Sequence, residues 1–155
     1  MTCIRPLRDL PGCIDLLAAW HHAEWGRLYS DWPLQVARSE LQDHATRYSI
    51  PATLVLEDAA GPIGSVSVVN VDAPELTAFG SPWLASLFVR PDARGLGHGK
   101  SLVRAAVALA AQSGVTRLCL FTPGQRAFYE SLGWAYRSDA TLGDTTVALM
   151  DITPQ

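Results

Sequence analysis

Apolar and polar residues alternate with periods that change along the chain, and these changes predict a succession of strands and helices. Helical spacing is clear after residue 33, where Leu34, Ala37 and Leu41 fall on one face, and after residue 101, where the apolar face ends before Gly114. Asp9 and Pro11 provide a cap and a first turn for an earlier helix. Helices are predicted over about 9–24, 33–45, 101–113 and 124–131, and strands over 3–7, 53–57, 63–70, 83–89, 115–121, 135–137 and 145–150. This order, β-α-α-β-β-β-α-β-α-β-β, predicts an α/β fold.

Length and composition fit one folded unit. The chain has 155 residues, of which 48% are hydrophobic, and neither a Pro/Gly/Ser-rich linker nor a shift in composition divides it. A chain of this size can bury a single sizeable core, so we expect one domain over residues 1–155. The formal net charge of -3 favours neither nucleic acid nor an anionic membrane as a partner.

The sequence carries no evident signal for export, membrane insertion or metal binding. The first residues have no apolar run of signal-peptide length, and no later segment approaches the roughly 18 apolar residues that span a bilayer, so we expect a cytoplasmic protein. Cys3, Cys13 and Cys119 show no ligand spacing, and His21 and His22 lack a third ligand at helical spacing. Reduced thiols and no metal are therefore expected.

A glycine-rich turn between a strand and a helix is the most informative local feature. From Val89 to Ser101 the chain reads Val-Arg-Pro-Asp-Ala-Arg-Gly-Leu-Gly-His-Gly-Lys-Ser. A helix start carries unpaired backbone N–H groups and the positive end of the helix dipole, which together attract an anion. The glycines allow positive φ and a close approach to the ligand, and basic residues at positions 90, 94, 100 and 104 surround them. The predicted ligand is therefore a phosphate ester.

Spacing separates three phosphate-binding signatures. A mononucleotide P-loop needs Gly-x-x-x-x-Gly-Lys-Ser/Thr, but the residue five positions before Gly99 is Arg94, and the strand near 117–122 ends without a metal-holding acid. A dinucleotide fingerprint that starts at Gly95 needs glycine where Lys100 stands. The third pattern, Arg/Gln-x-x-Gly-x-Gly/Ala, is met by Arg94-Gly-Leu-Gly97-His-Gly99. This segment resembles the acyl-CoA pyrophosphate loop of the GNAT superfamily of N-acetyltransferases.

A second segment extends this resemblance towards the C-terminus. Phe128-Tyr-Glu-Ser-Leu-Gly-Trp134 looks like the GNAT signature Phe-Tyr-x-x-Leu-Gly-Phe/Trp. The resemblance implies the GNAT fold, a mixed central β-sheet of about seven strands with splayed central strands, flanked by about four helices. It also implies acetyl-CoA as the co-substrate and Tyr129 as the proton donor to the leaving thiolate. The alternative for Tyr129 is a packing role, with its hydroxyl bonded to the backbone.

The same resemblance assigns the residues that hold the co-substrate. In the GNAT fold the acyl-pantetheine arm enters the gap between the splayed strands and pairs with an open strand edge. Carried over to this chain, the thioester oxygen would meet a backbone N–H of Phe88 or Val89. The cofactor-binding residues implied in this way are Leu87, Phe88, Val89, Arg94, Gly95, Leu96, Gly97, His98, Gly99, Lys100 and Ser101.

The group that deprotonates the acceptor stays open at this point. A primary amine has a pKa of about 10 and must lose a proton before it attacks a thioester. Many GNAT enzymes have a glutamate on the central strand, but residues 83–89 carry no carboxylate. A water near Ser86 is one alternative. The others are Asp72, Glu75, Glu24 and His21, each of which also has a plain solvated role as its competing interpretation.

The first two helices and their connection are the expected acceptor region. Residues 20–32 contain three tryptophans, a tyrosine and a glutamate, which suits an ammonium group. Packing of the helix pair onto the sheet accounts for the same aromatic residues equally well. The predicted acceptor-binding residues are Trp20, Glu24, Trp25, Tyr29, Trp32 and Ser86.

Together these features predict an N-acetyltransferase that moves acetyl from acetyl-CoA to a primary amine of a small molecule or peptide. The sequence is also compatible with a homodimer. A non-catalytic GNAT module that binds acyl-CoA as a sensor or partner is the alternative. Thr122 and Gln125 stand where many relatives have Asn and Ala, which affects the expected details of the pantetheine and thiolate contacts.

Overall fold

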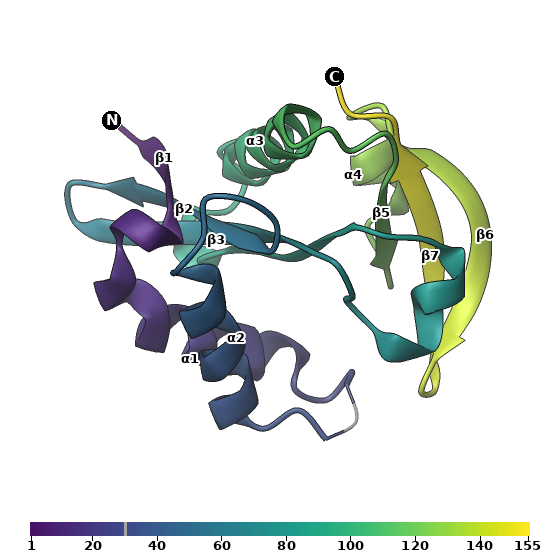
Figure 1. Cartoon of the computed structure of the whole chain (residues 1–155), viewed down its shortest axis with the longest axis horizontal. Coiled ribbons are helices and arrows are strands. Elements are labelled where there is room, and N and C mark those ends of the chain that lie inside the picture. Colours follow the sequence, from purple (N-terminus) through teal and green to yellow (C-terminus); the bar gives the residue numbers. More distant parts are fainter. Residues whose placement is uncertain (30) are drawn as a thin grey trace.

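The computed structural model describes residues 1–29 and 31–155. Within them, seven strands form one mixed sheet in the order β1-β2-β3-β4-β5-β7-β6 (Figure 1). The strands are β1 (Cys3–Pro6), β2 (Ala52–Asp58), β3 (Gly61–Val69), β4 (Trp83–Val89), β5 (Leu118–Thr122), β6 (Ala135–Leu142) and β7 (Thr145–Ile152). The α-helices are α1 (Ile14–Trp25), α2 (Leu34–His44), α3 (His98–Gln112) and α4 (Arg126–Glu130). Short 3-10 turns are η1 (Leu7–Asp9), η2 (Pro11–Cys13), η3 (Pro74–Phe79) and η4 (Pro91–Ala93). The predicted α/β fold is confirmed.

Helices cover both faces of the first half of the sheet. Figure 1 shows α1 and α2 on one side of β2 and β3, and α3 on the other. The alternation of β2 explains this arrangement, because Val55 packs with α1 and α2 while its neighbour Leu56 packs in the cluster that contains α3. On α3 the predicted apolar face is buried through Leu102, Val103 and Ala106.

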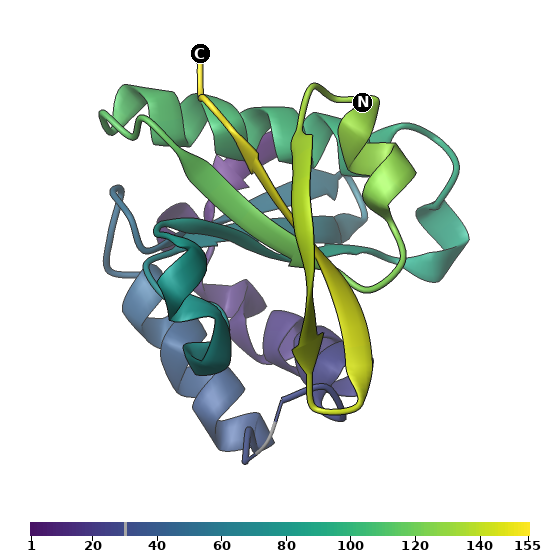
Figure 2. The same ribbon diagram turned by 90° about the vertical axis from the view of Figure 1, so that its right-hand side faces the viewer.

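Strands β4 and β5 run parallel and pair at one position among the described residues, where Trp83 lies opposite Cys119. The Cys119 N–H donates to the carbonyl of Pro82 at 3.0 Å. Beyond this point β4 continues with β3, and β5 continues with β7. Figure 1 shows β5, β7 and β6 running steeply across the direction of β2 and β3, and Figure 2 faces this second half of the sheet. The predicted splay of the central strands is therefore present.

A bulge shapes the open half of β4. Between the pairs Ser67–Ala85 and Ser65–Phe88, β4 contains one residue more than β3. Ser86 lies in this bulge with φ at 55°, a left-handed conformation that is uncommon for a residue with a side chain. Bulges bend a strand and increase its local twist. The distortion therefore falls where β4 leaves β5.

Several predicted boundaries differ from the structure, including the start of β5, which is Leu118 where residue 115 was predicted. Two of the differences have a clear physical reason. Helix α1 begins at Ile14, later than predicted, because Leu10, with φ at -132° and ψ at 51°, ends η1 and the 3-10 turn η2 leads directly into the helix. Cys13 therefore precedes the helix, and the predicted cap Asp9 lies in η1. Strand β6 extends over Ala135–Leu142, well beyond the predicted residues 135–137. Its outward positions are polar and exposed, so no hydrophobic pattern marks the strand in the sequence. The strand forms because its backbone pairs with β7.

Candidate active site

The glycine turn leads from η4 into the N-terminus of α3. Gly95 has φ at 81° and Gly97 has φ at 85°, so both use backbone conformations that disfavour a side chain. A Cβ at either position would meet no atom within 4 Å, which means that the turn borders open space. Gly97 caps α3 without a side-chain hydrogen bond. The turn therefore leaves the first N–H groups of α3 available to an anion.

The charge around this turn is positive. Arg94 is held in place because its Nε donates to the Val89 carbonyl at 2.8 Å and its guanidinium carbon lies 5.6 Å from the centre of the Phe88 ring. Lys100 follows in the first turn of α3, which contains no acidic residue. The helix dipole and the two side chains act in the same direction, and both favour a phosphate group.

A cavity of about 960 Å³, here called the first cavity, extends from the glycine turn along β4 to α4. Of the predicted cofactor residues, only Leu96 and Ser101 are missing from its lining. Leu96 is 71% exposed, and the Ser101 hydroxyl donates to the Gly97 carbonyl at 3.2 Å. The structure thus brings the other predicted positions together along one groove, which includes the part of β4 that lies beyond its pairing with β5.

Tyr129 lies in the wall of the first cavity on α4 and is 7% exposed. Its ring packs at 5.1 Å from Phe128 and 6.0 Å from Trp134, measured between ring centroids. Its hydroxyl makes no hydrogen bond within residues 1–29 and 31–155, in contrast to the backbone-bonded alternative. Burial, and then the negative charge of Asp72, raise the pKa of Tyr129 well above its usual value. The phenol is therefore a neutral O–H group that faces the cavity.

The segment before α4 contains Thr122 and Gln125, the two residues that depart from the GNAT pattern. Thr122 and Gln125 both line the first cavity. The Thr122 Oγ1 accepts hydrogen bonds from the backbone N–H of Gly124 at 3.4 Å and of Gln125 at 3.0 Å. The Thr122 hydroxyl therefore closes the turn that leads into α4.

A second cavity of about 480 Å³ borders α1, α2, β3 and β4. Its wall shares four residues with the first cavity, which are Tyr29, Asp72, Ala85 and Ser86. The Ser86 bulge thus separates two spaces, one beside the glycine turn and one beside the first two helices. A molecule in the second cavity could meet a molecule in the first at this shared wall.

Asp72 is the titratable carboxyl group of the shared wall. It is partly buried, and its Oδ1 accepts a hydrogen bond from the Tyr29 hydroxyl at 2.7 Å. Burial raises the pKa of Asp72 to about 7, although the hydrogen bond from Tyr29 acts in the opposite direction. A carboxyl group with this pKa can exchange a proton near neutral pH.

The other three base candidates occupy less suitable positions. Glu24 is exposed at the first cavity, and Glu75 on η3 borders neither cavity. His21 borders the second cavity, but its Nε2 lies 2.9 Å from the Ser65 hydroxyl, and burial lowers the pKa of His21 to about 4. Asp72 is therefore the candidate that combines access to both cavities with a suitable pKa.

The predicted aromatic residues divide between packing and cavity walls. Trp25 and Tyr29 line the first cavity, while Tyr29 and Trp32 line the second. Trp20 borders neither cavity and stacks on Phe88 with ring centroids 5.0 Å apart. The packing interpretation thus describes Trp20 best, since it joins α1 to β4.

Several residues that line the second cavity were not among the sequence-predicted site residues. Glu40 and His44 border it from α2, together with Ala37 and Leu41. The four positions are spaced for one helix face. A glutamate and a histidine on this otherwise apolar face were the only feature of the sequence that could have indicated a site on α2. His44 is buried, its Nδ1 lies 2.8 Å from the Thr53 hydroxyl, and burial lowers its pKa.

Within residues 1–29 and 31–155, no group of three or more His, Cys, Asp or Glu side chains is arranged to hold a metal ion. No helix among the same residues has both the length and the apolar character to cross a membrane.

Comparison with known proteins connects this geometry to a family. Residues 50–136 match the sequence model of the acetyltransferase (GNAT) domain. This match covers more than half of the chain and includes β4, the glycine turn and Tyr129. A search of the curated proteins finds no match.

Solved structures of acetyltransferases have the same fold. An N-acetyltransferase from Staphylococcus aureus Mu50 superposes with a TM-score of 0.77 at 10% identity, over 100% of this chain and 99% of that one. An aminoglycoside 6′-N-acetyltransferase in complex with coenzyme A gives 0.76 at 16% identity, over 99% and 97%. A variant of spermidine N-acetyltransferase from Vibrio cholerae gives 0.71 at 16% identity, over 99% and 94%. At these identities the similarity shows the fold.

Proposed function

The chain belongs to the GNAT acetyltransferase family, and on this premise we propose that it transfers an acetyl group from acetyl-CoA to a primary amine. The observation that carries the proposal is the first cavity, which joins the glycine turn to Tyr129 along the free part of β4. One groove thus offers an anion site at one end and a proton donor at the other. A coenzyme A thioester has the matching chemistry, since a pyrophosphate and a thioester lie at opposite ends of its pantetheine arm.

Binding of acetyl-CoA is assigned to the turn and to β4. Backbone N–H groups at the start of α3, with Arg94 and Lys100 beside them, bind the pyrophosphate. The backbone of Leu87, Phe88 and Val89 pairs with the pantetheine amides, because this part of β4 borders the cavity and has no β5 partner within the described chain. The thioester carbonyl then lies beside the bulge.

The acceptor amine is activated at the shared wall. It binds as an ammonium ion and gives a proton to Asp72, which burial keeps at a pKa near 7. Tyr29 holds the carboxylate through the 2.7 Å hydrogen bond and leaves the second carboxylate oxygen for the ammonium group. The neutral amine is then placed for attack on the thioester carbon.

Acetyl transfer forms a C–N bond and breaks the C–S bond. The carbonyl oxygen carries negative charge in the tetrahedral intermediate, and a backbone N–H of Phe88 or Val89 stabilises it. Tyr129 donates its proton to the departing sulfur, and the second proton, which the nitrogen loses as the amide forms, restores the phenol through solvent, while Asp72 releases the first proton to solvent. The free hydroxyl of Tyr129 and its neutral state support this role.

Two of the structural relatives support an amine acceptor. One is an aminoglycoside 6′-N-acetyltransferase and another is a spermidine N-acetyltransferase. Both names describe acetyl transfer to nitrogen. The acidic and aromatic wall formed by Tyr29, Trp32 and Asp72 suits the same acceptor chemistry here.

Release of free thiol from acetyl-CoA in the presence of amines tests the proposal. The wild-type protein is compared with Tyr129→Phe and with Tyr48→Phe, in which the lost hydroxyl is on a side chain that is 59% exposed. We expect amine-dependent thiol release that falls roughly tenfold or more in Tyr129→Phe and is unchanged in Tyr48→Phe. Tight binding of acetyl-CoA with no thiol release would instead identify the non-catalytic binding module.

A further inference from the structure

The second cavity has an acidic lining. Its described lining contains three carboxyl groups, from Asp31, Glu40 and Asp72, and contains neither lysine nor arginine. Its two histidines do not offset this charge, because burial lowers the pKa of both His21 and His44 and keeps them neutral. An acceptor with a single ammonium group would neutralise only part of this lining.

The carboxyl groups lie at two levels of the cavity. Asp72 is partly buried at the wall shared with the first cavity, whereas Glu40 on α2 is more exposed. The two levels are bridged by aromatic rings, since Tyr29 and Trp32 have centroids 5.3 Å apart. Trp32 also donates from Nε1 to the Glu40 Oε1 at 3.2 Å, which holds this ring beside the outer carboxylate. A carboxylate beside aromatic rings is a favourable place for a cation.

The size of the cavity indicates the kind of molecule that fits. A volume of about 480 Å³ lies within the range of about 300–1,000 Å³ that is typical of small-molecule sites. A second positive charge on such a molecule could reach the outer carboxylate while its amine is at Asp72. A carboxylate on the molecule would have no cationic partner in the described lining.

We propose that the second cavity selects acceptors with two or more cationic groups, with one amine at Asp72 and a second ammonium group at the Glu40 carboxylate beside Trp32. This inference rests on the proposed function, because it places the reacting amine where acetyl-CoA would meet it. Diamines and polyamines are the substrate class. Amino acids and other acceptors with a carboxylate are disfavoured.

A matched set of amines tests this selection through binding. Calorimetry measures the affinity of putrescine, n-butylamine and γ-aminobutyrate, and of their six-carbon analogues, for protein saturated with coenzyme A, so that no transfer can occur. We expect a diamine to bind about tenfold or more tightly than the monoamine of the same length, and the amino acid to bind most weakly.

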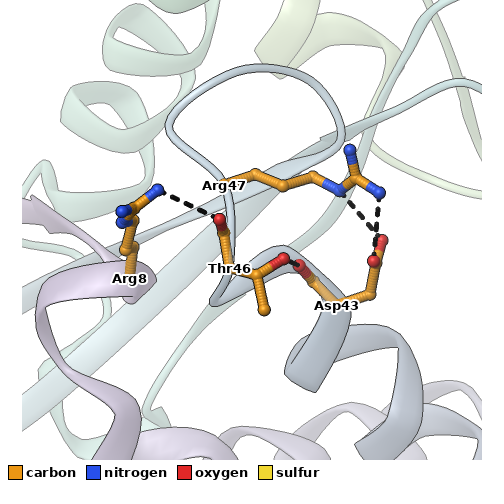
Figure 3. A network of polar contacts seen from close by, with 4 residues as sticks. All are labelled: Arg8, Asp43, Thr46 and Arg47. Carbon is orange, nitrogen blue, oxygen red and sulfur yellow. Dashed lines mark hydrogen bonds and ion pairs between the residues drawn. The ribbon is translucent and has the colours of Figure 1, made fainter.

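Two variants of α2 locate the effect. Glu40→Gln removes the outer charge but keeps an oxygen that can accept the Trp32 hydrogen bond. Asp43→Asn is the control, because it removes another carboxylate from the same helix. The Asp43 carboxylate pairs with Arg47 at 3.2 Å, and Asp43 borders neither cavity (Figure 3). The advantage of the diamine should largely disappear in Glu40→Gln and persist in Asp43→Asn.

Equal affinities for the diamine and monoamine at both lengths, or no binding by either diamine, would overturn the inference. An equal effect of Glu40→Gln and Asp43→Asn would also overturn it. Thiol release is measured separately so that the two proposals fail independently. If all three amine classes are acetylated alike, the proposed function stands and the cation site does not. If diamines bind as expected without any thiol release, the cation site stands and the proposed function does not.

Discussion

Alanine at Gly97 tests whether the glycine turn binds the co-substrate. Gly97 has φ at 85°, and a Cβ there meets no atom within 4 Å, so the change adds backbone strain without a steric clash. A left-handed alanine costs about 1–2 kcal/mol. For a domain of this size that cost corresponds to a fall in Tm of roughly 2–8 °C. An alanine that relaxes towards negative φ turns the N–H groups away from the anion.

Gly114 supplies a matched control at the other end of α3. Its φ is 79°, and a Cβ there also meets no atom within 4 Å, so Gly114→Ala should cost a similar amount of stability. Gly114 borders neither cavity. The two variants therefore introduce the same strain and differ in their distance from the proposed site.

Thermal unfolding with and without acetyl-CoA separates strain from binding. At a ligand concentration about a hundredfold above Kd, binding stabilises the wild type by about 2.7 kcal/mol. A tenfold loss of affinity in Gly97→Ala reduces this stabilisation to about 1.4 kcal/mol at the same concentration, while Gly114→Ala keeps the full value. Full ligand stabilisation in both variants would refute the assignment of the turn. An equal loss of ligand stabilisation in both variants would show that strain at either end of α3 weakens acetyl-CoA binding.

Three further predictions concern titratable side chains. Asp72→Asn should lower kcat and remove a rise in rate with pH centred near 7, and an unchanged pH–rate profile would exclude Asp72 as the base. His21 has a folded pKa of about 4, below its unfolded value of 6.5, so the unfolded state binds more protons between these values. About 3 kcal/mol of stability should thus be present above pH 6.5 and be lost as the pH falls to about 4, as measured by urea unfolding, and His21→Gln should flatten this dependence. Asp151 accepts hydrogen bonds from Arg117 at 2.9 Å and Arg137 at 3.0 Å, so Asp151→Asn should cost about 1.5–3 kcal/mol in the same assay and leave the thermal shift with acetyl-CoA unchanged.

Local sequence signals were sufficient for much of the fold. The apolar face of α3 depends on the period of its own residues and is buried as expected, and β2 lies where its residues predicted a strand. The end of β6 was not predictable in this way, because its exposed residues carry no strand period and its partner β7 determines its length. The start of α1 depends on residues 11–13 forming a 3-10 turn after Leu10, which their side-chain types do not reveal.

The candidate site also contains parts that local sequence predicts and parts that depend on tertiary structure. The glycine turn and Tyr129 belong to short contiguous motifs, and each could be assigned from neighbouring residues. The bulge at Ser86 could not, because serine has no preference for a φ of 55° and the register with β3 creates it. The pairing of Tyr29 with Asp72 joins residues 43 positions apart, so the raised pKa of Asp72 depends on tertiary burial. The second cavity, which needs α2 as well, was visible only in the folded chain.

Transfer of a labelled acetyl group tests the central claim most directly. Acetyl-CoA with an isotopic label in its acetyl group is incubated with the protein and a diamine, and mass spectrometry follows the label. The account predicts a labelled amide on the amine and an equal amount of free coenzyme A thiol, with both reduced together in Tyr129→Phe. Label that stays on coenzyme A although acetyl-CoA is bound, or that appears only as acetate, would contradict it.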